Sequence, residues 1–165
     1  MAALTNDRVT PKKMVFKEKA YPVKTNVKIY SGAIVGVDSA GFAIPAANAA
    51  SVKVVGVAKA QADNTGGADG AIYVNVEEGL FQFPASSITQ AMVGQNMYVV
   101  DDNTVDDVVG TAGVKAGRLL EFNSTGLGWI WIQPAGVGTV LANGSDLATT
   151  QALANDLKDI INKWL

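Results

Sequence analysis

Three glycines, Gly66, Gly67 and Gly70, are the first residues whose type and spacing could bind a ligand. A glycine-rich loop cradles a phosphate when a helix follows it, because the free amides at the helix N-terminus then face the anion. Here residues 71–78, AIYVNVEE, follow with strand-like alternation, and no Lys-Ser/Thr pair is present. The segment 64–70 is therefore predicted to be a long hairpin connection in which the glycines supply positive φ.

A second group of chemically capable residues lies in the stretch YVVDDNTVDDVVG, which holds four aspartates: Asp101, Asp102, Asp106 and Asp107. A calcium loop of the EF-hand type that starts at Asp101 requires glycine at its sixth position and glutamate at its twelfth. The chain has Asp106 and Ala112 there. The stretch is instead predicted to be a hairpin with its turn at 101–104 and its carboxylates in water.

Adjacent carboxylates at Glu77 and Glu78 raise the question of an acid/base pair. Neighbouring residues of a strand face opposite sides, so these two cannot act together, and alternation places Glu77 opposite Ile72, Val74 and Val76. The 165-residue chain has no histidine and no cysteine, which excludes Ser/His/Asp and Cys/His centres and thiolate metal sites. We therefore expect no enzyme, no catalytic residue, no metal ligand and no cofactor. A hydrolase that uses carboxylates is an alternative that requires a cleft with two carboxylates within reach of each other.

The elements that position these residues are short β-branched and aromatic runs separated by Gly, Asn, Asp and Ser. This pattern is typical of antiparallel barrels and sandwiches. The candidate strands cover residues 27–30, 33–37, 41–45, 52–60, 71–78, 79–84, 97–101, 105–109, 117–122 and 129–133. The fold class predicted is mainly β, a compact antiparallel β-barrel or sandwich over residues 25–134. In its last strand, alternation places Trp129 and Trp131 on one face and Ile130 and Ile132 on the other.

The N-terminal segment 1–24 is basic and has little periodicity. The first 28 residues carry seven basic side chains against two acidic ones, whereas the remainder carries six against thirteen. We expect an extended arm that orders only on an acidic partner surface, because its apolar content is too low to fold alone. Phe16 and Tyr21 form no spaced aromatic platform, so a nucleic-acid partner is not expected.

No membrane segment is expected. The N-terminus lacks the apolar core of a signal peptide, and no apolar run reaches the roughly 18 residues that span a bilayer.

The C-terminal segment changes to helical periodicity after a Gly-rich linker at 135–145. Ser145 can cap a helix over 146–165, with Asp146 in its first turn. One apolar stripe results, which consists of Leu153, Leu157, Ile160, Ile161 and Trp164. An isolated helix of this length is marginal in water, so the stripe has to pack on its own barrel, on a neighbouring subunit or in a bundle of copies.

Four phrases together resemble a known family: KIYSGAIVGVDSAGFAIPA (28–46), VVGVAKAQADNTGGADGAIYVNVEEGLFQF (54–83), MYVVDDNTV (97–105), and AGRLLEF followed by GWIWI. Their order and spacing resemble the capsid cement, or head-decoration, proteins of tailed bacteriophages, over about residues 11–133. The C-terminal helix departs from the short family pattern and resembles the helical tails of some phage head fibres.

The resemblance implies a non-enzymatic virion protein, made in the host cytoplasm, that binds major capsid protein on the outer surface of an assembled shell and reinforces it. The expected shell-contact residues are the basic and apolar side chains of the arm: Arg8, Lys12, Lys13, Phe16 and Lys17. The C-terminal stripe is expected to join copies, with a homotrimer favoured over a homodimer. The rival function is a carbohydrate- or cell-surface-binding module on the phage head, which exposed Trp129, Trp131 or Tyr98 on one face would support.

Overall fold

The protein is mainly β in its computed structural model, which describes residues 3–85, 87–123 and 126–132. The strands are β1 (Lys12–Pro22), β2 (Lys28–Ile29), β3 (Ile34–Val37), β4 (Ala43–Pro45), β5 (Lys53–Ala58), β6 (Ala62–Asp63), β7 (Tyr73–Pro84), β8 (Asn96–Val99), β9 (Val105–Asp106), β10 (Lys115–Asn123) and β11 (Leu127–Ile132). One 3₁₀ turn, η1 (Gln90–Met92), precedes β8. The predicted linker 135–145 and helix 146–165, with the stripe residues Leu153, Leu157, Ile160, Ile161 and Trp164, lie outside the described residues.

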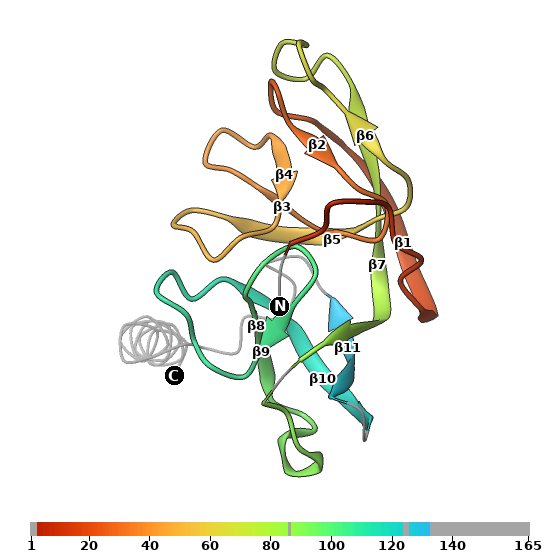
Figure 1. Cartoon of the computed structure of the whole chain (residues 1–165), viewed down its shortest axis with the longest axis vertical. Coiled ribbons are helices and arrows are strands. Elements are labelled where there is room, and N and C mark those ends of the chain that lie inside the picture. Colours follow the sequence, from red (N-terminus) through yellow and green to blue (C-terminus); the bar gives the residue numbers. More distant parts are fainter. Residues whose placement is uncertain (1–2, 86, 124–125, 133–165) are drawn as a thin grey trace, which may run out of the picture. The chain divides into compact units, whose positions relative to one another are not determined.

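Nine of these strands form one antiparallel sheet that curves into a half-barrel (Figure 1). Its order is β4-β3-β5-β7-β11-β10-β8-β9, and β1 pairs with the remaining edge of β7. β2 and β6 form a separate pair. The predicted antiparallel β architecture is confirmed at this level.

β7 is central because it serves two hydrophobic clusters with opposite faces. Val74 and Val76 point into an N-terminal cluster built from residues 23–76, whereas Phe81 and Phe83 point into a C-terminal cluster with the buried side chains of β8, β10 and β11. All four side chains are at most 1% exposed. The buried face of the strand therefore changes from its even-numbered to its odd-numbered positions between Val76 and Glu77.

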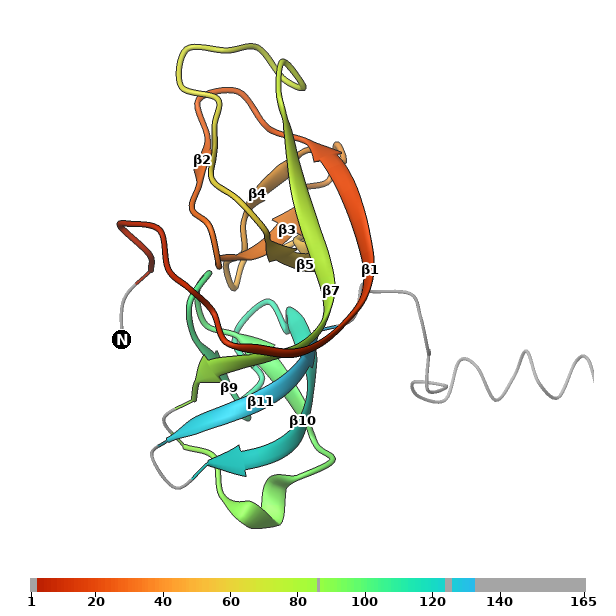
Figure 2. The ribbon, with the colours of Figure 1, turned by 90° about the vertical axis from the view of Figure 1, so that its right-hand side faces the viewer.

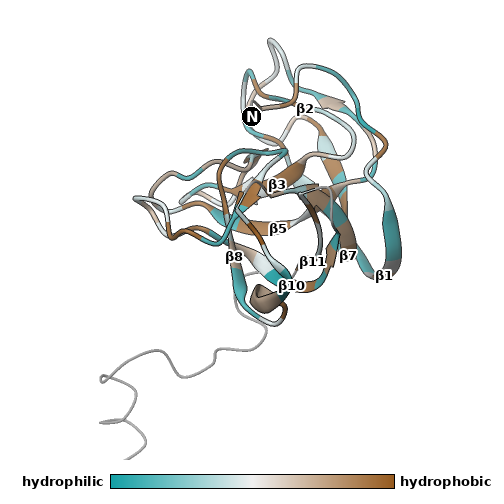
Figure 3. Ribbon diagram, turned by 60° about the horizontal axis from the view of Figure 1, so that its bottom comes forward, coloured by the Kyte–Doolittle hydropathy of each residue, from teal (hydrophilic) through white to brown (hydrophobic). Residues whose placement is uncertain are grey.

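β3 and β5 lie between the same two clusters. In β3, Ile34 belongs to the C-terminal cluster and its neighbour Val35 to the N-terminal one. In β5, Val54 and Val55 divide in the same way. Strands buried on both faces read as continuous apolar runs, which is why the alternation in these segments is weak. Figure 3 shows β5 mostly brown, whereas much of β1 is teal.

The predicted strands at 71–78 and 79–84 are one strand, so the expected break between them is wrong. Gly79, the first residue of the second predicted strand, is paired on both edges, with Val15 of β1 and Ile132 of β11. The hydrogen-bonded ladder therefore continues through this position.

The N-terminal arm differs most from its prediction. Residues 12–22 form β1, which is antiparallel to β7 from Lys12 opposite Phe81 to Pro22 opposite Tyr73, with two register shifts (Figure 2). The expectation that this segment orders only on a partner is therefore wrong for residues 12–22. Its order comes from backbone hydrogen bonds to a strand more than 50 residues further along the chain, which local apolar content does not reveal.

The segment 64–70 is a loop, as predicted, but the expected hairpin is wrong, because β6 before it pairs with β2 and β7 after it pairs with β1, β5 and β11. One glycine also acts differently from the prediction. Gly66 and Gly70 have φ of 76° and 75°, whereas Gly67 does not have positive φ. A side chain at Gly67 would collide with the Asn64 amide oxygen. Asn64 is 2% exposed, and its side-chain nitrogen donates to the backbone carbonyls of Val23, Lys24 and Ala68 at 2.8–3.2 Å.

Candidate functional site

β1 is a long edge strand with an unusual burial pattern. Its described side chains from Lys12 to Ala20 are all exposed, and only Tyr21 and Pro22 are half-buried. Among the described strands it pairs with β7 alone, so its other edge carries backbone groups without a strand partner. An edge of this kind can accept a further strand from another chain. Lysines and register shifts on an edge strand act against unspecific pairing, and β1 has both.

Lys12, a predicted shell-contact residue, is bound within its own chain. Its ammonium nitrogen lies 2.8 Å and 2.7 Å from the two carboxylate oxygens of Glu77. Glu77 faces away from Val74 and Val76, as alternation predicts, yet it is only 5% exposed. Glu77 is the first odd-numbered position of β7 after Val76, and from this position onward the odd-numbered side chains of the strand are the buried ones. A second ammonium, that of Lys59, lies 4.0 Å from the Glu77 carboxylate.

Lys13 connects β1 to β11 and β10. Its ammonium lies 4.4 Å from the ring centroid of Trp129 and also forms an ion pair with Glu121. Both partners of this ion pair are about half exposed, so solvent screens their attraction. Lys12 and Lys13 are thus exposed, but each already has an acidic partner in its own chain.

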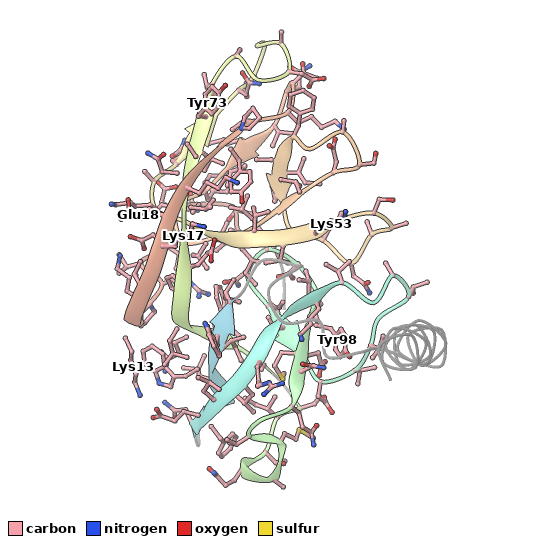
Figure 4. The ribbon with its side chains drawn as sticks, turned by 180° about the vertical axis from the view of Figure 1, so that it is seen from behind. Lys13, Lys17, Glu18, Lys53, Tyr73 and Tyr98 are labelled. Carbon is pink, nitrogen blue, oxygen red and sulfur yellow. The ribbon has the colours of Figure 1, made fainter. Side chains whose placement is uncertain are left out.

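Lys17 has a different environment. It is exposed on β1 opposite Glu78, and no interaction of its side chain is found among the described residues (Figure 4). Lys19, two residues further on, lies over the ring of Tyr21 at 5.0 Å. Phe16 is also in β1, but its side chain lies outside what the structure describes.

Glu18 of β1 accepts a hydrogen bond from Lys59 at 2.7 Å. This bond lowers the pKa of Glu18 and raises the pKa of Lys59. It ties β1 to the end of β5 across the surface.

Arg8, the remaining predicted shell-contact residue, is folded against its own chain. Its guanidinium donates to Asn103 and to the backbone carbonyl of Gln82 at 3.1 Å, and it lies 5.2 Å from the ring centroid of Phe83. A third hydrogen bond runs from Arg8 Nε to the Thr10 hydroxyl oxygen at 3.2 Å. Burial lowers the pKa of Arg8. The prediction placed this residue on a partner surface, whereas the structure uses it to hold the segment before β1.

Asp102 anchors the same segment. One carboxylate oxygen accepts the Leu4 backbone N–H at 2.9 Å, and the Asp102 carbonyl accepts the Ile34 N–H at 2.7 Å. The residue is 3% exposed, so the expectation that this carboxylate lies in water is wrong. Burial raises the pKa of Asp102, and the Leu4 hydrogen bond opposes that rise.

The hairpin around this residue is confirmed. Asp101 opens the turn, since its carboxylate accepts the Asn103 N–H at 2.9 Å and Val100 N–H donates to the Thr104 carbonyl at 3.0 Å. Further along, the side-chain hydrogen bond between Asp107 and the neighbouring Asp106 raises the pKa of Asp107, because it favours the protonated form of that carboxyl.

A half-open cavity of about 220 Å³ lies beside the start of β1. Val57 and Phe81 contribute apolar lining, and Arg8, Lys12, Lys59 and Glu77 contribute charged groups. The Glu77 carboxylate already has Lys12 and Lys59 as partners. The cavity therefore holds one buried carboxylate, that of Glu77, whose charge is balanced by lysines of the same chain. The other charged groups that line the cavity are basic.

The two tryptophans of β11 share one face of the strand, as predicted, and that face points away from the C-terminal cluster. Trp129 and Trp131 are half-buried, whereas Ile130 and Ile132 are fully buried in the C-terminal cluster. The cross-strand neighbours of Trp129 are the polar residues Gln82 and Glu121. Those of Trp131 are the apolar Leu80 and the charged Arg118. Tyr98 of β8 is half-buried too and lines an open depression with Arg118 and Asp107.

Within residues 3–85, 87–123 and 126–132, no set of three or more acidic side chains is arranged to hold a metal ion. The same part of the chain contains no helix of sufficient length and apolarity to traverse a bilayer.

The sequence did not reveal the structural roles of three residues of this site: Glu77, Lys59 and Asp102. Each is defined by a partner far away in the chain, such as Lys12 for Glu77, so no local spacing could have identified it. Comparison with known proteins found no matching family model, no similar curated protein and no similar solved structure.

Proposed function

We propose that the protein is a capsid decoration protein of a tailed bacteriophage, which binds major capsid protein on the outside of the shell and reinforces it. The proposal combines the four phrases that resemble this family with one structural observation. That observation is β1, an 11-residue edge strand whose described side chains between Lys12 and Ala20 are all exposed.

β1 is suited to a protein partner because it offers two kinds of contact along one line. Its free edge can bind an extended segment of the shell through main-chain hydrogen bonds. Its side chains are basic, with four lysines and one glutamate between residues 12 and 19. The partner segment that fits is therefore extended and acidic. Weak contacts of this kind, repeated around a symmetric shell, sum to lasting attachment.

Lys17 and Lys19 are the side chains that this proposal depends on most. Lys12 and Lys13 form ion pairs with Glu77 and Glu121. Lys17 is exposed opposite Glu78, and no ion pair between these two side chains is found among the described residues. Arg8 acts indirectly, since it positions the segment that leads into β1.

The test is binding to shells of the phage that encodes the chain, prepared without this protein. The double variant Lys17→Glu, Lys19→Glu should bind at least about tenfold more weakly, a change of roughly 1.4 kcal/mol per copy. The matched control is Lys53→Glu, because Lys53 is an exposed lysine of β5 remote from β1 in Figure 4. Occupancy is measured by sedimentation of the shells and by cryo-electron microscopy.

Equal binding of both variants would contradict the role of β1. Failure of the unaltered protein to bind any site on the shell would contradict the function itself. Circular dichroism of each variant separates loss of binding from loss of folding.

The proposal includes self-association through the C-terminal stripe, with a trimer favoured over a dimer. The double variant Ile160→Ala, Trp164→Ala should then lower the mass measured by light scattering. An unchanged mass would favour packing of the stripe within one chain.

A second function, carbohydrate or cell-surface binding, is favoured by Trp129 and Trp131 on one outward face. Aromatic rings on a sheet face can pack on sugar rings, although the Lys13 ammonium lies over Trp129 here. A glycan array probed with the unaltered protein and with Trp131→Ala tests this function. Binding that disappears in the variant supports it, and no binding to any glycan rejects it.

A further inference from the structure

A depression of about 370 Å³ lies on the outer side of β8 and β10. In β8, the side chains of Met97 and Val99 are buried in the C-terminal cluster. Asn96 and Tyr98 alternate with them and therefore point to the opposite face of the strand (Tyr98 is labelled in Figure 4). Arg118 of β10 lies directly opposite Asn96. The polar residues that line the depression are Gln95, Asn96, Tyr98, Asp107 and Arg118.

Backbone hydrogen bonds hold the rim of the depression. The Gly94 N–H donates to the Leu119 carbonyl at 2.7 Å, and the Leu119 N–H donates to the Gln95 carbonyl at 3.0 Å. The opposite wall follows Asp106, which is paired with Tyr98 across β9 and β8. The depression is thus formed by the fold itself, and its volume falls in the range of about 300–1,000 Å³ that is usual for sites that bind small molecules.

Several polar side chains at this depression have hydrogen-bonding groups that no described residue engages. Among the described residues, no hydrogen bond or ion pair is found for the side chains of Gln95, Asn96 and Arg118. One carboxylate oxygen of Asp107, Oδ1, is buried and also lacks a hydrogen-bond partner in this part of the chain. The cavity beside β1 differs in this respect, because its charged groups bind other groups of the same chain.

The residue types of the lining indicate the class of ligand. Asp107 supplies acceptors, Arg118 supplies donors, and the amides of Gln95 and Asn96 supply both. With one acidic and one basic residue, the lining selects neither anions nor cations. The ring of Tyr98 offers a flat apolar surface. The ligand that matches this set is neutral, carries several hydroxyl groups that both donate and accept, and has an apolar ring face, as a neutral sugar does.

We propose that this depression binds one unit of a neutral saccharide. The sugar ring packs against Tyr98, and its hydroxyl groups bond to Asn96 and Arg118 at one wall and to Asp107 at the other. Planar amide, carboxylate and guanidinium groups each present two neighbouring hydrogen-bonding atoms, which suits a pair of adjacent hydroxyl groups. When the Asp107 carboxyl group turns toward the depression, a sugar hydroxyl supplies the donor that its buried oxygen lacks among the described residues.

Sugar binding at this depression rests on the second function proposed above, but it places the ligand at different residues. Tyr98 provides the ring contact, so Trp129 and Trp131 are not required. Sugar binding here and capsid binding through β1 are independent, because the depression and β1 share no residue.

The test uses the full-length protein on an array of neutral and acidic oligosaccharides, followed by isothermal titration calorimetry with the neutral oligosaccharide that binds best. Asn96→Ala and Tyr98→Ala should each weaken this affinity at least about tenfold. Asn96 is exposed, so its substitution should leave the fold intact, and circular dichroism checks both variants. The matched control is Gln90→Ala, which removes an exposed amide of η1 that does not line the depression and should leave the affinity unchanged.

Trp129→Ala distinguishes this site from the tryptophans, since Trp129 lies opposite Glu121, whereas Trp131 lies opposite Arg118 of the depression. Loss of binding in Asn96→Ala and Tyr98→Ala with retention in Trp129→Ala supports the proposal. The reverse pattern would overturn it and leave carbohydrate binding in place at the tryptophans. Binding of acidic oligosaccharides alone would also overturn it, and no binding to any oligosaccharide would reject carbohydrate binding itself.

Discussion

β11 and β1 pair with opposite edges of the same strand, β7, yet they are held there in different ways. β11 buries Ile130 and Ile132 completely in the C-terminal cluster. β1, nearly twice as long, buries none of its described side chains. Both strands have an antiparallel hydrogen-bond ladder with β7, so the difference between them lies in side-chain packing.

This difference suggests that β11 contributes to the stability of the domain, whereas β1 is available to bind a partner. Apolar burial supplies most of the free energy of folding, whereas backbone hydrogen bonds and exposed ion pairs contribute little net stability. β11 is therefore expected to unfold only with the whole domain. β1 is expected to open locally, and an element that opens locally is the kind that a partner can engage.

The largest loss of stability should come from a substitution in β11, whose side chains pack in the C-terminal cluster. Ile130→Ala should lower the free energy of unfolding by about 2–5 kcal/mol, because it leaves a cavity in the C-terminal cluster. Urea denaturation monitored by tryptophan fluorescence measures the loss. The matched change in β1, Val15→Ala, should cost no more than about 0.5 kcal/mol, because Val15 is 36% exposed. Similar losses in the two variants would break the comparison.

A smaller loss of stability is expected when Lys12 of β1, the ion-pair partner of the buried Glu77, is removed. Lys12→Ala should cost about 1–3 kcal/mol, because it leaves the Glu77 carboxylate buried without its closest cation. The double variant Lys12→Ala, Glu77→Gln should recover part of that loss, since the amide removes the buried charge. Urea denaturation of the four proteins in the cycle gives the coupling. A zero coupling energy would show that the ion pair does not help to hold β1.

Lys13 tests a side-chain connection between β1 and β11. Lys13→Ala removes a cation over the Trp129 ring and a solvent-screened ion pair, for which we expect about 0.5–1 kcal/mol. Lys53→Ala, on an exposed site of β5, is the control and should leave the denaturation midpoint unchanged. A loss above about 2 kcal/mol would mean that β1 is packed more firmly than its exposure indicates.

The smallest effect should be a pH dependence of stability that arises from Asp102, which binds the Leu4 backbone N–H in the segment before β1. Burial raises the pKa of Asp102, so the folded protein binds this proton more tightly than the unfolded chain does. The associated stability is present at low pH and is lost as pH rises through the folded-state pKa. Asp102→Asn does not titrate, so its stability relative to the unaltered protein should increase as pH rises above about 4. A difference that stays constant across this range would contradict the assignment.

The strands of the barrel could be predicted from the sequence because their signal is local. Alternation placed the tryptophans and the isoleucines of β11 on opposite faces, and the Gly and Asn positions located the loop at 64–70. Asp101 opened the predicted turn for the same reason, since an aspartate accepts a hydrogen bond from the residue two positions later.

β1 and the ionic part of the site could not be predicted in this way. Residues 12–19 are rich in lysine and show no apolar alternation. They form a strand because their backbone pairs with the edge of β7. Glu77 looked solvent-facing because Val74 and Val76 were buried on the other side, and the exchange of buried faces at Val76 is visible only when both clusters are present. Arg8 looked free because Asn103 and Gln82, to which its guanidinium donates, are more than 70 residues away in the sequence.

The exchange of buried faces along β7 also bears on the order in which the protein folds during synthesis. The N-terminal cluster uses side chains only up to Val76, so all of its core residues have been translated when the middle of β7 leaves the ribosome. The C-terminal cluster has to wait for Ile132. We therefore expect the nascent chain to pass through a stage in which one face of β7 is packed while Phe81 and Phe83 are still exposed to cellular chaperones.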